Sequence, residues 1–195
     1  MIGKAGGAAR SRTVILQAAL DLCAERSYAA VSMEAIAARA QVGKPTLYRW
    51  WPSKGALYLE ALTERVGEPY FLIPDTGDLE ADLRTWIHAA TKIFTDGALR
   101  GLLAGVVGSA QHDPELANIL YEQVHIPLSS RNRERIRAAQ ESGQLAGFDP
   151  YLLEDMLIAP LWYRLLISGQ PITPEYADMV VSAVLSLNPT PTGNA

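Results

Sequence analysis

The chain has 195 residues, of which 49% are hydrophobic and 19% are charged, and its formal net charge is −4. This composition supports a sizeable buried core, and the single cysteine, Cys23, excludes an internal disulfide framework and a cysteine-rich zinc site. Residues 101–112, the most apolar uncharged stretch, are too few for a membrane span, and no apolar segment follows Lys4 as in a secretory signal. We therefore expect a cytoplasmic protein that contacts no membrane.

The first two helices are expected at residues 12–26 and 33–40. In residues 12–26 the apolar side chains recur at helical spacing, and Ser11 can cap the start. Ser32 stands immediately before the second, shorter helix, where its hydroxyl can accept a hydrogen bond from a free backbone amide.

Two prolines mark the ends of the third helix. Pro45 lacks an amide proton and is tolerated only in a first turn, so a helix should begin at about residue 44. Pro52 disfavours helical geometry in the residue before it, so this helix should end at residue 51. Ser53 can then cap a fourth helix over residues 54–66.

The rest of the chain also has helical periodicity. Residues 67–77 are rich in glycine and proline and predict a connecting loop. Further helices are expected at residues 79–94, 98–111, 115–142, 150–168 and 174–187. No alternating strand pattern occurs, so the sequence predicts an all-α protein of about nine helices. The polar tail, residues 188–195, should be mobile.

The predicted helix over residues 115–142 has two notable features. Pro127 inside it should cause a kink. Its second half is charged, and we expect four arginines to be exposed there: Arg131, Arg133, Arg135 and Arg137.

Helix, short turn and helix over residues 32–51 have the dimensions of a helix-turn-helix, whose second helix enters the major groove of DNA. Leu47 and Trp51 lie four residues apart and can pack inward. The outward side chains are then Lys44, Thr46, Tyr48 and Arg49. Residues 1–65 carry nine Lys/Arg against five Asp/Glu, and the remainder eight against sixteen, so the first third suits a polyanionic partner.

The segment AQVGKPTLYRWWPSK, residues 40–54, with SMEAIA at residues 32–37, resembles the signature of the tetracycline-repressor (TetR) family of transcriptional regulators. Pro45 replaces the usual Gly or Ala and Trp51 the usual Phe, and both suit their positions. The resemblance implies a three-helix helix-turn-helix DNA-binding domain at residues 1–54. It also implies a helical effector-binding and dimerisation domain at residues 55–195.

The resemblance further implies which residues contact DNA. Thr46, Tyr48 and Lys54 would contact phosphates, together with Ser32. Two alternatives remain open: Ser32 could be only a helix cap, and Tyr48 could be a partly buried ring.

The remaining DNA-binding candidates lie on the third helix. Lys44 and Arg49 would read base edges. Trp50 could stack on the sugar-phosphate backbone or could cover the end of the fourth helix. Lys4, Arg10 and Arg12 could form an arm against DNA, although a solvated tail is the simpler interpretation.

Two apolar helices close the chain, at residues 150–168 and 174–187. The first is apolar nearly all round, so more than one of its sides must be covered. The pair resembles the one that forms a four-helix dimer bundle in the family, which implies a homodimer through these helices. A dimer would read a palindromic operator in double-stranded DNA.

Six apolar or amphipathic residues could line a cavity for a small hydrophobic or aromatic effector, with core packing as the alternative for each. They are Trp86, Phe94, Tyr121, His125, Met156 and Trp162. The three histidines do not have metal-ligand spacing, and no cofactor motif or catalytic arrangement is present, so we expect neither a metal nor an enzyme.

Together these features predict a bacterial, nucleoid-associated repressor that an effector releases from its operator. The alternative is a small-molecule carrier or interaction module with a vestigial helix-turn-helix.

Overall fold

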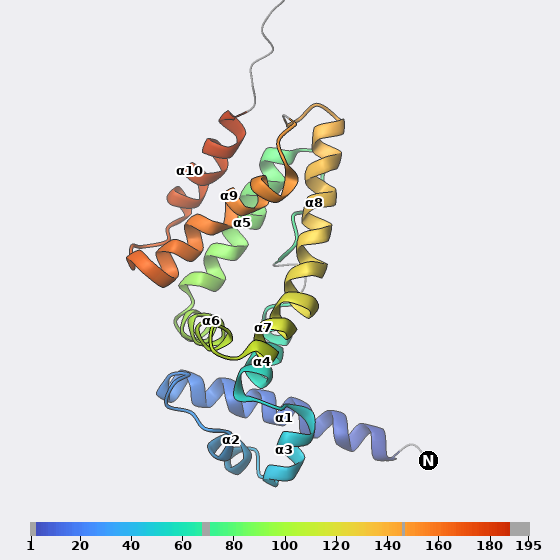
Figure 1. The fold of residues 1–195 in the computed structure, drawn as a ribbon, viewed down its shortest axis with the longest axis vertical. Coiled ribbons are helices and arrows are strands. Elements are labelled where there is room, and N and C mark those ends of the chain that lie inside the picture. Colours follow the sequence, from blue (N-terminus) through green and yellow to red (C-terminus); the bar gives the residue numbers. More distant parts are fainter. Residues whose placement is uncertain (1–2, 68–70, 146, 188–195) are drawn as a thin grey trace, which may run out of the picture. The chain divides into compact units, whose positions relative to one another are not determined.

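The computed structural model describes residues 3–67, 71–145 and 147–187, with side chains from Ser11 onward. In these ranges every regular element is helical, which confirms the all-α prediction (Figure 1). The described helices number nine when the uninterrupted helical runs Pro114–Glu141 and Pro150–Ser168 are each counted as one. None of them is long and apolar enough to cross a membrane. The tail at 188–195 lies outside the described residues.

By their internal contacts the residues form two compact units, the first from 1–67 with 96–121 and the second from 68–95 with 122–195. These units do not assign functions, so the division between a DNA-binding domain at residues 1–54 and an effector-binding domain at residues 55–195 stays a prediction.

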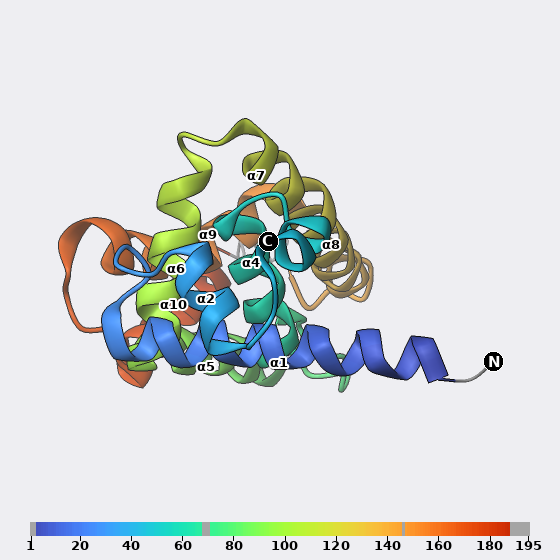
Figure 2. The same cartoon turned by 90° about the horizontal axis from the view of Figure 1, so that it is seen from below.

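The first unit is built around α1, which packs on α2, α4 and α6 (Figure 2). Its helices are α1 (Gly3–Arg26), α2 (Met33–Arg39), α3 (Lys44–Trp50), α4 (Lys54–Val66), α6 (Gly97–Ala110) and α7 (Pro114–Ile119). Ile15, Ile36, Leu47 and Leu57 have no exposed surface and form the centre of its core. The boundaries predicted from caps and prolines are confirmed for α2, α3 and α4 to within a residue.

The start of α1 differs from the prediction. The helix begins at Gly3, so Ser11 lies inside it and is not its cap. No glycine or proline occurs between Ala8 and Arg26, so nothing in the sequence ends the helix at Ser11. Arg12 therefore belongs to a helix and not to a solvated tail, whereas the side chains of Lys4 and Arg10 lie outside the described ones.

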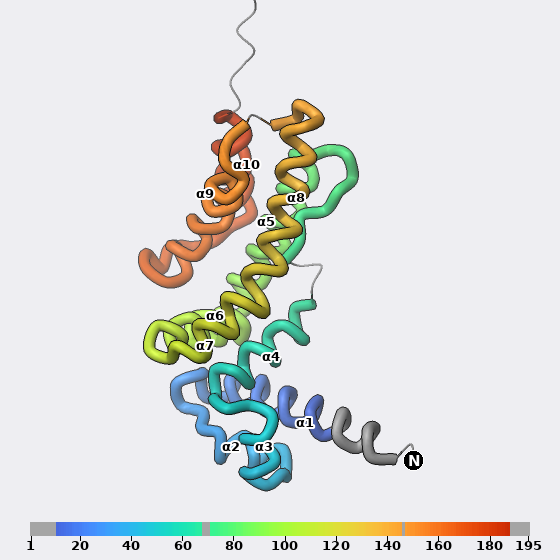
Figure 3. Tube along the Cα trace, turned by 45° about the vertical axis from the view of Figure 1, so that its right-hand side comes forward, coloured from blue at the N-terminus to red at the C-terminus, as the bar shows by residue number. Residues whose placement is uncertain are grey.

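In the second unit α5 packs on α9 and α10, and α8 packs on α9 (Figure 3). Its helices are α5 (Leu79–Thr95), α8 (Ile126–Glu141), α9 (Pro150–Tyr163), the π-helical η3 (Arg164–Ser168) and α10 (Pro174–Ser186). The perturbation expected at Pro127 takes the form of a π-helical segment, η2 (Leu120–His125), directly before α8. Proline cannot donate the regular helical hydrogen bond, and a wider turn accommodates its ring.

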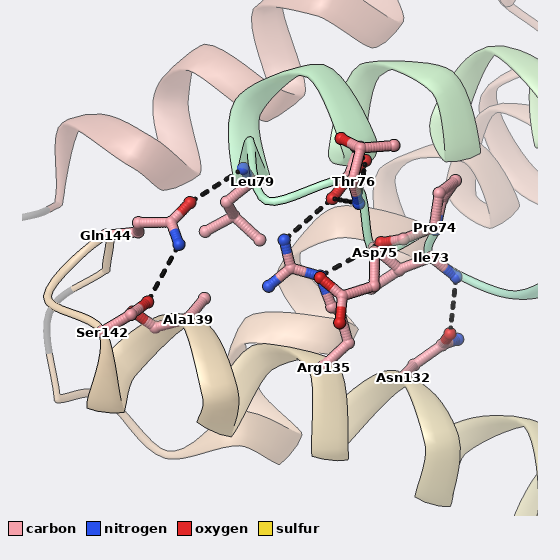
Figure 4. A network of polar contacts seen from close by, with 11 residues as sticks. Ile73, Pro74, Asp75, Thr76, Leu79, Asn132, Arg135, Ala139, Ser142 and Gln144 are labelled. Carbon is pink, nitrogen blue, oxygen red and sulfur yellow. Dashed lines mark hydrogen bonds and ion pairs between the residues drawn. The ribbon is translucent and has the colours of Figure 1, made fainter.

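Two of the four arginines expected at the surface of α8 are buried, so that prediction is wrong for Arg133 and Arg135. Arg135 donates from Nη2 to Asp82 Oδ2 at 2.8 Å and from Nε to the Pro74 carbonyl at 3.1 Å. Its Nε also lies 3.1 Å from Asp75 Oδ1 (Figure 4). A buried guanidinium is tolerated where carboxylates and carbonyls compensate it, and here they come from distant parts of the chain.

The second buried arginine has its own partner. Arg133 Nη1 lies 3.3 Å from Glu154 Oε2, which also accepts from Ser129 Oγ at 2.8 Å. Asn132 donates to Glu154 Oε1 and accepts from the Ile73 amide at 2.9 Å. These bonds fasten α8 to α9 and to the loop before α5.

Candidate nucleic-acid interface

The helix-turn-helix is formed by α2, a turn at 41–43 and α3. Ser32 Oγ accepts from the Ala35 amide at 3.2 Å, which confirms its role as the cap of α2. Gln41 adopts a left-handed conformation with φ of 55°, and this ends α2. Gly43 then stands before α3, and Pro45 occupies its first turn. The turn is therefore set by local backbone chemistry.

The two faces of α3 are divided as the spacing predicted. Leu47 is fully buried and Trp51 is 2% exposed, so both belong to the core. Lys44, Tyr48 and Arg49 are exposed, and two further residues, Thr46 and Trp50, are partly exposed. Tyr48 is 47% exposed, so about half of its surface is accessible to a partner, and the alternative of a partly buried ring stays open. Hydroxyl, ammonium and guanidinium donors thus share the outer side of one short helix.

The two cations of α3 have weak partners. Lys44 Nζ lies 3.2 Å from Glu34 Oε1, and both side chains are at least half exposed. Hydrogen bonding to its own backbone amide, and then to Lys44, lowers the pKa of Glu34. The Arg49 guanidinium lies 5.8 Å from the centre of the Trp50 ring. Exposed contacts of this kind contribute at most about 1 kcal/mol, so a phosphate or base could replace them.

Trp50 also contacts the next tryptophan. Its ring lies edge-on to that of Trp51, with the centroids 5.5 Å apart. One side of Trp50 is therefore packed, and the choice between stacking on DNA and covering the helix end stays open.

Lys54 has a structural contact that the sequence did not indicate. Its Nζ donates to the carbonyl oxygens of Tyr28 and Val31, each at 3.0 Å, and lies 4.3 Å from the centre of the Tyr28 ring. Burial lowers the pKa of Lys54. Two of its three N–H groups thus hold the turn between α1 and α2, and one is left for the predicted phosphate contact.

Sequence reasoning also missed a cluster at the end of α3. Trp51 Nε1 donates to Glu60 Oε2 at 2.9 Å, and Arg12 donates to both oxygens of the same carboxylate. The signal that could have found it is the tryptophan itself, because a buried indole N–H requires an acceptor.

The six candidate effector residues have different surroundings. Phe94 and Trp162 contact each other edge to face, with centroids 4.8 Å apart. Trp86 is buried, and Met156 is partly exposed. Two further candidates, Tyr121 and His125, are exposed. Two surface depressions of about 510 and 310 Å³ are lined by none of the six, so the effector site stays a prediction.

An apolar surface of the second unit is uncovered in the single chain. Its residues, which we call the α9–α10 face, are Tyr151, Leu152, Tyr163, Leu166, Ile167, Met179 and Leu187. Ile167 is 72% and Met179 61% exposed, and a group of such side chains on neighbouring elements indicates a surface that meets a partner. Among the described residues no group of three or more His, Cys, Asp or Glu could hold a metal ion.

Family comparisons match both halves of the chain. Residues 15–61 match the model of bacterial regulatory proteins of the tetR family, and residues 73–184 match the tetracyclin repressor-like C-terminal domain. The chain belongs to the TetR family. It is therefore a helix-turn-helix transcriptional regulator, as the motif at residues 40–54 predicted.

Individual relatives cover nearly the whole chain. An uncharacterized HTH-type transcriptional regulator of Bacillus subtilis, YdeS, is 29% identical over 90% of this chain and 89% of its own. The DNA-binding transcriptional repressor TetR of Mycobacteroides abscessus is 28% identical over 93% of this chain and 94% of its own. The TetR family transcription regulator SCO0332, known from a crystal structure, is 33% identical in sequence. The two structures align with a TM-score of 0.75 over 90% of this chain and 97% of SCO0332. The likeness thus extends through both units.

Proposed function

We propose that this regulator is a repressor that binds a palindromic operator as a homodimer and is released by a small hydrophobic or aromatic effector. The outer side of α3 carries the DNA-binding part of the proposal. Its exposed donors, with a buried Leu47 and Trp51 behind them, match what a helix in the major groove requires.

In this proposal Thr46 and Tyr48 contact phosphates, because their hydroxyls lie on an accessible side of α3. Lys54 and Ser32 would add phosphate contacts from the starts of α4 and α2. Beside the bond that it accepts from Ala35, the Ser32 hydroxyl also donates to the exposed Glu34 carboxylate, and it would exchange that carboxylate for a phosphate.

Base readout would come from Lys44 and Arg49. Arg49 can bond two acceptors of a guanine at once, and in the described part of the chain its guanidinium lies over the face of Trp50. Lys44 would exchange Glu34 for an acceptor of the DNA. Trp50 would then lie beside the backbone of the operator.

The α9–α10 face supports the dimer. Seven large apolar side chains are exposed on α9, on η3 that continues it, and on α10 or directly after it. A second copy would cover them by two-fold symmetry. Ile167→Asp should convert the protein into monomers, whereas Val14→Asp, at an exposed apolar residue of α1, should not. Light scattering coupled to size-exclusion chromatography distinguishes the two results, and a dimer that persists in Ile167→Asp contradicts this interface.

The effector would bind among the apolar helices of the second unit, beside the aromatic pair Phe94 and Trp162. An aromatic compound that weakens operator binding should also raise the melting temperature of the free protein, because it stabilises the state that it binds. Trp162→Ala should abolish both effects of such a compound while leaving operator binding intact.

The direct test of DNA binding is selection of bound fragments from random double-stranded DNA. The expected product is an inverted repeat whose half-sites lie about one helical turn, or about 10 base pairs, apart. Tyr48→Ala should weaken binding to every sequence, whereas Lys44→Ala should also relax the selected sequence. Absence of any enriched sequence at moderate salt would contradict the proposal.

The alternative, a carrier or interaction module with a vestigial helix-turn-helix, makes the opposite prediction about salt. Binding to DNA through Lys and Arg must weaken as salt rises, because counterions are released from the phosphates. Binding that is flat between low and moderate salt would favour the alternative.

A further inference from the structure

The recognition helix α3 has few anchors. It is seven residues long, and within it only Leu47 is buried. Its contacts are mainly with α2. A helix of this length is not stable alone, so its direction depends on the contacts at its two ends. At the C-terminal end that contact is made by Trp51.

Trp51 is the residue that ends α3. Its backbone N–H still bonds to the Leu47 carbonyl, while its own backbone is extended. The indole is 2% exposed, and its Nε1 donates to Glu60 Oε2 on α4 at 2.9 Å. A phenylalanine would fill this space without needing an acceptor. The indole N–H of a buried tryptophan requires one, and the Glu60 carboxylate provides it.

Glu60 serves a second donor group at the same time. Arg12 of α1 donates from Nε to Oε1 at 2.6 Å and from Nη2 to Oε2 at 2.5 Å. The Arg12 guanidinium also lies 5.9 Å from the centre of the Trp51 ring. Two parallel bonds between guanidinium and carboxylate fix the orientation of both groups. The Glu60 side chain is only 22% exposed.

We propose that Glu60 is a positioning residue for DNA binding, which sets the direction of α3 by holding Trp51 against α1 and α4. The inference rests on DNA binding through α3. Glu60 does not contact the DNA, and its negative charge by itself repels phosphates. Its loss should nevertheless weaken operator binding, because the end of α3 loses its hydrogen-bonded anchor.

The sign of the effect separates positioning from simple electrostatics. Glu60→Gln and Glu64→Gln each raise the net charge by one, and both residues lie on α4. Glu64 is exposed and lies one helical turn beyond Glu60. Simple electrostatics predicts tighter DNA binding for both variants. Positioning predicts tighter or unchanged binding for Glu64→Gln and weaker binding for Glu60→Gln.

The experiment measures affinity for a duplex selected from random DNA by the wild-type protein, and for an unrelated duplex of equal length. Glu60→Gln should bind the selected duplex about tenfold more weakly. The amide offers one acceptor oxygen in place of two to the three N–H donors of Trp51 and Arg12, and losing a hydrogen bond to a charged group has an effect of this size. Its affinity for the unrelated duplex should not fall. Measurements are made well below the melting temperature of each variant, with helicity checked by circular dichroism, so that unfolded protein does not contribute.

Trp51→Phe tests whether Glu60 acts through the indole. This variant keeps a large core aromatic and removes the N–H donor. If Glu60 acts through Trp51, the loss on Glu60→Gln should be much smaller in the Trp51→Phe background than in the wild type. In protein labelled with ¹⁵N-tryptophan, the indole signal of Trp51 is identified as the one missing from Trp51→Phe. This signal should shift in Glu60→Gln and remain in place in Glu64→Gln.

Two results would overturn this inference without affecting the DNA-binding function. One is a Glu60→Gln variant that binds the selected duplex as tightly as the wild type. The other is a loss of affinity on Glu60→Gln that is equally large in the wild type and in the Trp51→Phe background. Failure of the wild-type protein to select any duplex would instead overturn the DNA-binding function, and this inference with it.

Discussion

Helices α3 and α8 both carry positively charged side chains, but they place them differently. On α3 Lys44 and Arg49 point outward, and their partners are exposed. On α8 Arg133 and Arg135 are buried against Glu154 and a pair of aspartates. The same residue types therefore offer a surface for a polyanion in one unit and hold the core together in the other.

The difference comes from acidic residues elsewhere in the chain. Asp82 and Glu154 lie on α5 and α9, far from α8 in sequence, and each is buried opposite one arginine. The acid that pairs with Lys44 of α3, Glu34, is itself exposed, so Lys44 keeps access to other partners. A cationic helix is thus available to DNA only where no buried acid faces it.

The largest expected effect is on the buried pair of α8. Asp82→Asn leaves the Arg135 guanidinium buried with only the exposed Asp75 as a charged partner, and this should lower the free energy of unfolding by about 3 kcal/mol. Asp155→Asn, at an exposed carboxylate of α9, should change it by less than about 0.5 kcal/mol. Urea denaturation measures both, and equal stabilities would show that the buried pair is dispensable.

The same pair should depend on pH. Burial by itself raises the pKa of Asp82, but hydrogen bonds from Arg135 and Thr76 outweigh it and leave the pKa below its usual value of 3.8. A lowered pKa in the folded state contributes stability that is present above the usual pKa and is lost as the pH falls through the lowered one. The stability difference between wild type and Asp82→Asn should therefore be constant above about pH 5 and shrink below about pH 4. A difference that grows on acidification would contradict this sign.

On α3 the expected effect is on binding and not on folding. Arg49→Ala should reduce the discrimination between the selected sequence and a mismatched one by about 1–3 kcal/mol, if its guanidinium reads a base. Its melting temperature should stay that of the wild type, because Arg49 is exposed. Arg137→Ala, at an exposed arginine of α8, should alter neither quantity. A loss of stability in Arg49→Ala would remove the contrast between the two helices.

The smallest expected effect concerns the partner of Lys44. Glu34→Gln removes a carboxylate that competes with DNA for this ammonium, so affinity should rise about two- to fivefold, the scale of an exposed ion pair. Glu25→Gln, which changes the net charge equally but pairs with Arg39, is the matched control. Filter binding at two salt concentrations measures the difference, which should diminish at the higher one. An equal rise in both variants would mean that only net charge matters.

Local rules accounted for much of the fold. Pro45, Pro52 and the capping residues Ser32 and Ser53 fixed the limits of α2, α3 and α4, because each acts on neighbouring backbone atoms. The inward positions of Leu47 and Trp51 followed from helical spacing. The predicted start of α1 was wrong, because a serine that can cap a helix does not end one when the residues directly before it, 8–10, include no helix breaker.

Contacts between distant residues were beyond these rules. Lys54 was assigned to a phosphate, but the carbonyls that take two of its protons belong to Tyr28 and Val31. Nothing local links Lys54 to Tyr28 or Val31. The sequence could indicate that the buried Trp51 indole needs an acceptor, but not that this acceptor is Glu60.

The sequence by itself determined that this protein is an all-helical TetR-family regulator with an outward polar face on the helix at residues 44–51. Periodicity, proline and capping chemistry act within a few residues, so they are readable without a structure. Only the tertiary structure decided which charges are free and which are buried. Whether an arginine, lysine or tryptophan faces a partner depends on helices that fold against it from elsewhere in the chain, as Asp82 does for Arg135 and Glu60 for Trp51.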